Sequence, residues 1–363
     1  MDKYSQLDSP TSDSILPLRR ANIFYSIQLL IFGIICLIFF YVPNSWLIKI
    51  TRIEGSSKTA IAFSFTTRIS FSLCLWYIAH GLITLGNNDL HDSCQLKAHS
   101  LFLSIHEIFL ICIIFGCLFL PEKFVSTFFK ISIFISAIYL IFQFFVLHDM
   151  FDKLNLKFYT EEKIVLPIII LILFSSLSIS LFIVSFICFK CTESRLIIGL
   201  NLLLCVIIVI VSFFLEDQSV ITASMISSYI AYITFTASMV DYDCCSFSHK
   251  AISITFEIIS VAFILNFLLW NSFNLTGQVN LLTCTDRDES SFSLTYFHFV
   301  LAFASCFVTM IVTNWGDPNG SHFYNQGVQV WIKWTLVTIS WIILTLYVWS
   351  FFARKCCPDR EFD

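Results

Sequence analysis

Long runs of apolar residues fill most of the chain, and short polar segments separate them. Residues 164–188 and 197–215 form two such runs, each long enough to cross a hydrocarbon layer of about 30 Å as a helix. Neither run alternates apolar with polar residues, as the strands of a membrane barrel do over segments of roughly ten residues. The pattern therefore predicts an all-α integral membrane protein.

The apolar runs predict ten transmembrane helices. Their expected ranges are 22–42, 59–85, 98–120, 126–150, 163–189, 196–215, 219–240, 251–270, 295–315 and 328–352. The fourth run continues into polar residues, and a single helix over 124–154 would measure about 46 Å. Because this length exceeds the hydrocarbon layer, we expect that helix to tilt or to protrude from the membrane.

Charges beside the first and last helices indicate the orientation in the membrane. An even number of crossings puts both ends of the chain on the same side. Arg19 and Arg20 precede the first helix, and Arg354 and Lys355 follow the last. Because Lys and Arg are enriched on the cytoplasmic side of membrane proteins, both ends are predicted to be cytoplasmic.

The chain is predicted to form one membrane domain with polar ends. Residues 1–18 are polar and lack the apolar core of a cleavable signal peptide, so we expect a disordered head there. The ten-helix domain is expected over 19–355, with a cytoplasmic loop at 271–294 and a cytoplasmic tail at 356–363. The sequence shows no internal repeat that would favour an inverted-repeat transporter.

Composition and motifs argue against several classes of function. Hydrophobic residues make up 57% of the 363 residues and charged residues 13%, against about 25% charged in soluble domains. The net charge is −4 and Lys and Arg do not cluster, so nucleic acid is not an expected partner. The sequence lacks a P-loop, a dinucleotide-binding glycine motif and a serine-nucleophile elbow. We therefore expect neither enzymatic activity nor a cofactor.

A set of short blocks runs along the chain. The blocks are Arg68-Ile69-Ser70-Phe71, Gly116-Cys117-Leu118-Phe119-Leu120-Pro121, Cys191-Thr192-Glu193, Gly199-Leu200-Asn201-Leu202, Ser219-Val220-Ile221, Thr313-Asn314-Trp315, Trp331-Ile332-Lys333, Ser340-Trp341 and Asp359-Arg360-Glu361-Phe362. Together they cover most of residues 60–363 and resemble the serine incorporator family of eukaryotic membrane proteins. The chain departs from that family in lacking its cysteine-rich N-terminus and in having a shorter loop before the ninth helix.

The resemblance implies a fold, a location and an activity. The fold would be ten helices in two subdomains with a long, tilted crossmember helix, located in the plasma membrane or the endomembranes (ER or Golgi) of a eukaryotic cell. The implied activity is ATP-independent phospholipid scrambling between leaflets. The alternative is a carrier or scaffold that supports serine incorporation into phosphatidylserine and sphingolipids. A non-catalytic protein acting through its loops is a third class, which the short loops disfavour.

The resemblance also implies partners. Membrane phospholipids come first. Sphingolipids, sterol, lipid-synthesis enzymes and a second copy of the chain are further candidates.

Ionisable residues inside the apolar runs are candidates for binding lipid, because an unpaired charge in a bilayer costs roughly 2.5–3.5 kcal/mol. The candidates are Arg68, His106, Glu107, Glu257 and Lys333. Arg68 and Glu107 lie at similar depths in consecutive helices, so we expect them to pair. Glu257 and Lys333 also share a depth. The opposing interpretation is that each charge is only neutralised within the bundle.

Residues in the predicted outer loops are candidates for covalent modification. Cys191 is expected to form a disulfide with Cys244 or Cys245, because all three would face the oxidising side. Asn319 begins an Asn-Gly-Ser sequon and is the candidate glycosylation site.

Metal binding is not predicted. His106-Glu107 starts like a zinc-protease motif, but Leu110 stands where the second histidine would be. Cys188 and Cys191 form one C-x-x-C pair, and no second pair follows at zinc-finger spacing.

Overall fold

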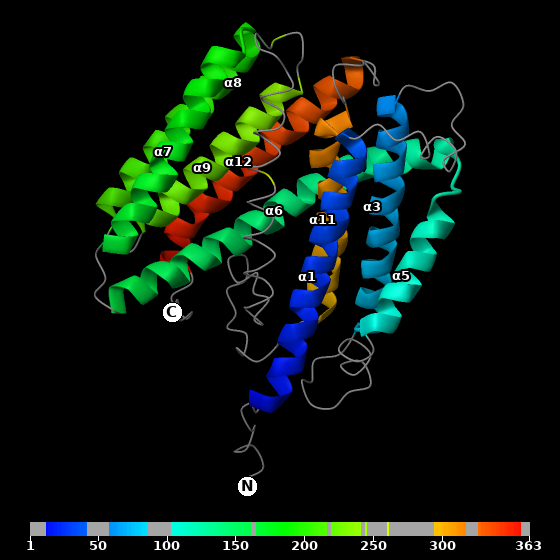
Figure 1. Cartoon of the computed structure of the whole chain (residues 1–363). Coiled ribbons are helices and arrows are strands. Elements are labelled where there is room, and N and C mark those ends of the chain that lie inside the picture. Colours follow the sequence, from blue (N-terminus) through cyan, green and yellow to red (C-terminus); the bar gives the residue numbers. More distant parts are fainter. Residues whose placement is uncertain are drawn as a thin grey trace. The chain divides into compact units, whose positions relative to one another are not determined.

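The structure is a computed structural model, and helices make up its long elements (Figure 1). It describes residues 12–41, 58–85, 103–160, 165–215, 219–240, 244, 260, 294–316 and 326–356. Within these ranges, eight helices are long and apolar enough to cross a membrane, and Ile105–Cys117 is apolar but shorter. The all-α prediction is confirmed. The count of ten crossings stays a prediction, because the expected helix at 251–270 lies almost wholly outside the described residues.

The chain divides into two compact units, and the first, unit 1, is built around α3. Its described helices are α1 (Ser12–Tyr41), α3 (Lys58–Ile83), α5 (Leu103–Cys117), the start of α6 (Glu122–Thr160) and α11 (Leu294–Val312). α3 packs on α11, α1 and α5. Gly33 of α1 and Gly81 of α3 permit close approach, since a Cβ at either position would lie 3.3 Å from a side chain of α11.

The second unit, unit 2, is built around α9 (Val220–Met239). α7 (Val165–Cys188), α8 (Thr192–Phe214) and α12 (Gln326–Cys356) all pack on α9 (Figure 1). Every residue from 221 to 239 is buried, so α9 is enclosed along its length. Unit 2 also contains α6 from Ala137 onward.

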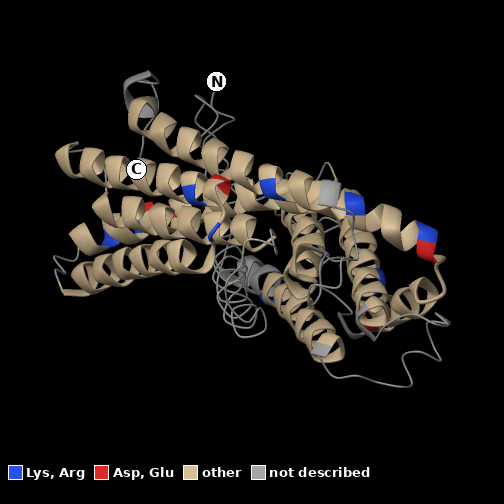
Figure 2. Cartoon of the chain, turned by 90° about the horizontal axis from the view of Figure 1, so that it is seen from above, with Lys and Arg blue, Asp and Glu red and all other residues tan. Residues whose placement is uncertain are grey.

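Apolar side chains point outward from these helices, and small polar side chains point inward. Ile172 of α7 is 62% exposed and Phe213 of α8 is 73% exposed, whereas Thr66 and Ser228 are fully buried. Lys, Arg, Asp and Glu are sparse along the helices (Figure 2). A water-soluble fold has the opposite arrangement. This one fits a protein surrounded by lipid, in which a buried hydroxyl such as that of Ser228 donates to the helix backbone.

α6 is the longest of the described helices. It has 39 residues and begins at Glu122, directly after Pro121, which cannot continue the preceding helix. At ~1.5 Å per residue it measures about 58 Å, well beyond the thickness of a hydrocarbon layer. Its start belongs to unit 1 and its remainder, from Ala137, to unit 2, so one continuous helix joins the two.

Two helix ends differ from the sequence prediction. α1 begins at Ser12, so residues 12–18 of the head expected to be disordered are helical. Ser and Asp are favourable at a helix start, and the Ser12-Asp13-Ser14 sequence explains the early beginning. The third predicted helix, 98–120, is described over Leu103–Cys117.

Candidate functional site

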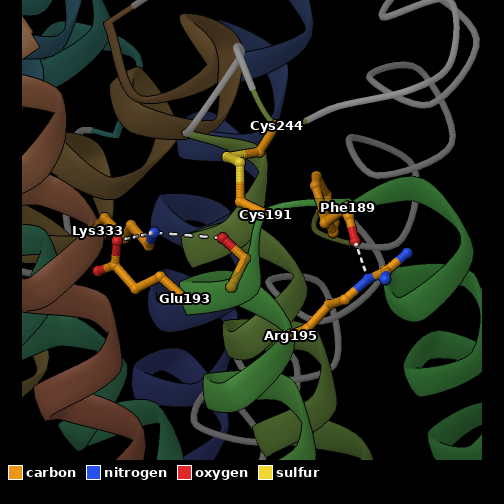
Figure 3. Close-up of a disulfide and its surroundings, with 7 residues drawn as sticks. Phe189, Cys191, Glu193, Arg195, Cys244 and Lys333 are labelled. Atoms are coloured by element: carbon orange, nitrogen blue, oxygen red, sulfur yellow. Dashed lines mark hydrogen bonds and ion pairs between the residues drawn. A yellow bond between two sulfur atoms is a disulfide. The ribbon is translucent and has the colours of Figure 1, made fainter.

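Lys333 of α12 is buried in unit 2 and pairs with the start of α8. Only 4% of Lys333 is exposed; its Nζ lies 3.5 Å from Glu193 Oε2 and donates to Ser194 Oγ over 3.2 Å (Figure 3). Glu193 lies in the first turn of α8, where the helix dipole favours a carboxylate, and 55% of its side chain is exposed. The pair therefore joins a buried positive charge to a carboxylate that reaches the surface.

A disulfide fixes the start of α8 beside this pair. Cys191 directly precedes α8 and is bonded to Cys244, with Cα atoms 5.2 Å apart (Figure 3). The Lys190 backbone N–H also donates to Cys244 O over 2.9 Å. The sequence left Cys244 and Cys245 open as partners of Cys191, and the structure shows the bond to Cys244. Cys245 lies outside the described residues.

Asn201 forms a polar junction in the middle of unit 2. Its Nδ2 donates to Thr234 Oγ1 of α9 over 2.7 Å and to Ser340 Oγ of α12 over 3.2 Å. Its Oδ1 accepts from Trp341 Nε1 over 3.0 Å. Asn201 is fully buried, so these bonds replace the water that its amide loses on burial.

A third polar group lies near the far end of α12. The ring of Tyr347 is 5.8 Å from the ring of His148, centroid to centroid. His148 Nδ1 lies 2.9 Å from Asp152 Oδ2, and Thr222 of α9 donates to Asp152 Oδ1 over 2.9 Å. α6, α9 and α12 therefore each contribute a polar side chain here.

These three groups form a polar ladder through unit 2. It consists of Glu193, Ser194, Lys333, Asn201, Thr234, Ser340, Trp341, Tyr347, His148, Asp152 and Thr222. Lys333, Ser340 and Tyr347 recur at intervals of seven residues, which is close to two helical turns, so they share one face of α12. The 14 steps from Lys333 to Tyr347 span about 21 Å of helix.

Sequence reasoning identified Lys333 as a candidate but missed Asn201, Ser340 and Tyr347 as members of the same site. The available signal was their spacing. Asn201 follows Ser194 by seven residues on α8, and Ser340 follows Lys333 by seven on α12. Polar residues at that interval in two apolar helices mark one polar face on each.

Arg68 pairs with Glu122 and not with Glu107, so the expected Arg68 to Glu107 pair was wrong. Arg68 is 3% exposed; its Nη2 lies 2.7 Å from Glu122 Oε1 and donates to Leu120 O over 2.8 Å. Ser64 accepts from Arg68 Nη1 and donates to Glu122 Oε1 over 2.7 Å. Glu122 lies in the first turn of α6, where the helix dipole favours a carboxylate. The sequence prediction compared only the depths of Arg68 and Glu107 in their helices and did not consider this helix start.

His106 and Glu107 contact α1 within unit 1. The Tyr25 hydroxyl lies 3.0 Å from His106 Nδ1, and Gln28 Nε2 donates to Glu107 Oε1 over 2.8 Å. Both residues are half-buried on α5. They belong to a group of polar side chains at one end of unit 1 that the sequence did not predict.

The remaining predicted site residues, Glu257 and Asn319, lie outside the described residues. Among the residues that the structure describes, no group of three or more His, Cys, Asp or Glu side chains is arranged to hold a metal ion.

The fold and the buried polar groups define a multi-pass α-helical membrane protein. The family model for serine incorporators (Serinc) matches residues 12–290 and 280–360. The chain therefore belongs to the serine incorporator family, as its sequence blocks indicated.

Curated relatives carry the same family name. Serine incorporator 3 of Mus musculus is 22% identical over 393 residues, which cover 86% of this chain and 83% of that protein. A probable serine incorporator of Nematostella vectensis is 33% identical over 73 residues, and serine incorporator 5 of Rattus norvegicus is 34% identical over 79 residues. These two local matches span 20% and 22% of this chain, but only 16% and 17% of the relatives' own length.

Proposed function

We propose that the protein lets phospholipids cross between the two leaflets of a membrane without ATP. The observation that supports this proposal is the polar ladder of unit 2. A headgroup in hydrocarbon loses its hydration, and its phosphate charge makes that loss costly. A chain of mostly buried polar side chains offers replacement partners along the way, which lowers the barrier in both directions.

Lys333 is the phosphate-binding residue in this proposal. It is a buried cation whose present partner, Glu193, is a half-exposed carboxylate. A lipid phosphate is also an anion with several acceptor oxygens, so it can take the place of the carboxylate beside Lys333. From Lys333 to Tyr347 the ladder is about 21 Å long, compared with a hydrocarbon layer about 30 Å thick.

The lipid tails would stay in hydrocarbon during this passage. The outer faces of α8 and α12 expose apolar side chains, including Leu203 at 57% and Trp331 at 74%. Lipid tails can cover such faces while the headgroup exchanges partners on the ladder. The passage consumes no chemical energy, so we propose a transport role and not an enzymatic one.

We further propose ten crossings in two subdomains, with α6 as a tilted crossmember helix. A helix of about 58 Å fits a layer of about 30 Å only by tilting or protruding. The proposed location is the plasma membrane or the endomembranes of a eukaryotic cell. The proposed partners are its phospholipids.

Serine supply to lipid-synthesising enzymes is the second candidate, and the relatives' printed name, serine incorporator, favours it. A serine-supplying protein must bind free serine, which is a small zwitterion, and it need not move intact lipid between leaflets. Labelled serine uptake into the same vesicles separates the two functions.

Reconstitution into liposomes tests the proposal. Vesicles containing a trace of headgroup-labelled fluorescent phospholipid are treated with a membrane-impermeant quencher, which bleaches only the outer leaflet. Protein-free vesicles lose about half of their signal, since a bilayer has two leaflets. Vesicles with the protein should lose well over half in the absence of ATP. Loss that stops at the protein-free value would refute scrambling.

A matched pair of lysine variants locates the path. Lys333→Leu should slow bleaching by roughly ten-fold, which corresponds to ~1.4 kcal/mol in barrier height. Lys130→Leu removes an exposed lysine from α6 outside the ladder and should bleach like the unsubstituted protein. Equal rates for the two variants would remove Lys333 from the path.

A further inference from the structure

Helices of unit 1 bring three histidine rings and a tyrosine together. His80 of α3 lies between the others, with its ring centroid 5.0 Å from that of His106 on α5 and 5.2 Å from that of His298 on α11. Tyr25 of α1 has its ring 5.4 Å from His80 and 5.1 Å from His298, and its hydroxyl lies 3.0 Å from His106 Nδ1. Tyr25, His80, His106 and His298 are called the imidazole cluster below.

One carboxylate lies beside the imidazole cluster. Glu107 follows His106 on α5 and accepts a hydrogen bond of 2.8 Å from Gln28 of α1. Tyr77 of α3 donates to Gln28 Oε1 over 2.9 Å, so the tyrosine, the amide and the carboxylate form a short chain. Glu107 and Tyr77 are therefore titratable groups that lie beside the cluster.

The imidazole cluster is buried yet close to helix ends. His298 is fully buried and His80 is 6% exposed, whereas His106 is half-buried. His80 lies three residues before the end of α3, His106 three after the start of α5, and His298 four after the start of α11. These separations are about 5–6 Å of helix, so a proton from water need not cross the hydrocarbon layer to reach the cluster.

We propose that the imidazole cluster is a proton-binding site. It takes up one proton with Glu107 as counter-charge, and a second proton loosens α5 from unit 1. Imidazole in water changes charge between about pH 5 and pH 8, and burial moves that change to lower pH. A single cationic ring is balanced by Glu107, the one carboxylate beside the cluster among the described residues. A second cationic ring is not, because His80 stands about 5 Å from both other histidines.

α5 is the helix that this repulsion displaces. It packs mainly on α3 and reaches α1 through His106 and Glu107, and its outward face carries Ile108 at 62% exposed and Phe109 at 59% exposed. It contributes His106 and Glu107, the half-buried members of the site. α3, in contrast, is held by α1 and α11 as well. The inference is independent of lipid transport, so either proposal can fail without the other.

Hydrogen–deuterium exchange of the full-length protein in lipid nanodiscs tests the inference. The uptake of α5 peptides is divided by that of α12 peptides in the same sample, which cancels the pH dependence of chemical exchange. Between about pH 7.5 and about pH 4 the ratio should rise by roughly two-fold or more. A ratio that does not change with pH in the unsubstituted protein would overturn the proposal.

Two histidine variants identify the proton-binding ring. His80→Phe keeps a ring between the other histidines but cannot be protonated, so the rise in the ratio should disappear. His148→Phe removes the histidine that pairs with Asp152 in unit 2 and should leave the rise unchanged. His106→Gln, at a half-buried position, repeats the test if His80→Phe does not fold. An undiminished rise in His80→Phe or in His106→Gln contradicts the proposal.

Discussion

Replacing Asn201 with leucine should lower the free energy of unfolding of the protein by about 1–2 kcal/mol. Asn201 is fully buried, and its amide makes hydrogen bonds to Thr234, Ser340 and Trp341. Side-chain hydrogen bonds in membrane proteins contribute ~0.6 kcal/mol on average and ~1.7 at most, so three are worth about 2 kcal/mol. Leucine recovers part of this through apolar contact with α9 and α12.

Most of this loss in the free energy of unfolding should come from the hydrogen bond between Asn201 and Trp341. Thr234 Oγ1 also donates to Ile230 O over 2.7 Å, and Ser340 Oγ donates to Val337 O over 2.7 Å. Those hydroxyls therefore keep their donor bonds when Asn201 is replaced, whereas the Trp341 indole loses its acceptor. A double-mutant cycle of Asn201→Leu with Trp341→Phe should give a coupling energy of ~0.6–1.7 kcal/mol.

Unfolding in mixed micelles with increasing SDS measures all four members of the cycle. Trp334→Phe on the exposed side of α12 is the matched control, and its effect should add to that of Asn201→Leu. Coupling below ~0.3 kcal/mol between positions 201 and 341 would refute the hydrogen-bonded junction, because independent sites add within about that margin.

Two further predictions concern the ends of the units. Arg68→Leu should lower the unfolding free energy by about 1–3 kcal/mol, since it leaves Glu122 and Leu120 O without their cationic donor; the same SDS titration checks it, and an unchanged midpoint contradicts it. Cys191→Ser should cost about 4 kcal/mol under oxidising conditions, from the entropy of the open 53-residue loop. Reducing agent should abolish the difference between Cys191→Ser and the unsubstituted protein. A difference that persists after reduction would contradict this account.

Helix positions could be predicted because a bilayer demands long apolar segments. The predicted helix at 163–189 is described as Val165–Cys188, and that at 219–240 as Val220–Met239. Apolar length fixes such boundaries almost alone, since each backbone group must be satisfied within its own helix. The start of α1 at Ser12 depends instead on local capping, which hydropathy does not measure.

Side-chain partners could be predicted only where the chain itself restricted the choice. Cys191 had two candidate partners in one loop, and one of them is bonded to it. Arg68 had many candidate partners, and its depth in the membrane does not indicate which helix end lies beside it. The carboxylate of Glu122 is supplied by the start of α6, a position that the sequence showed only as a loop boundary.

The imidazole cluster could not be predicted at all from single residues. His80, His106 and His298 are separated by 26 and 192 residues, and each resembles an isolated histidine near a helix end. Their proximity depends on α3 packing against both α5 and α11. Only tertiary structure supplies that information.

Lipid scrambling by this protein is tested most strictly by comparing the two directions of lipid movement in one preparation of proteoliposomes. Outward movement is followed by quencher bleaching of labelled lipid, and inward movement by loss of extractability of lipid added outside. Equal rates are expected in both directions without ATP, and Lys333→Leu should reduce both rates equally. Movement no faster than in protein-free vesicles, or movement in one direction only, would contradict it.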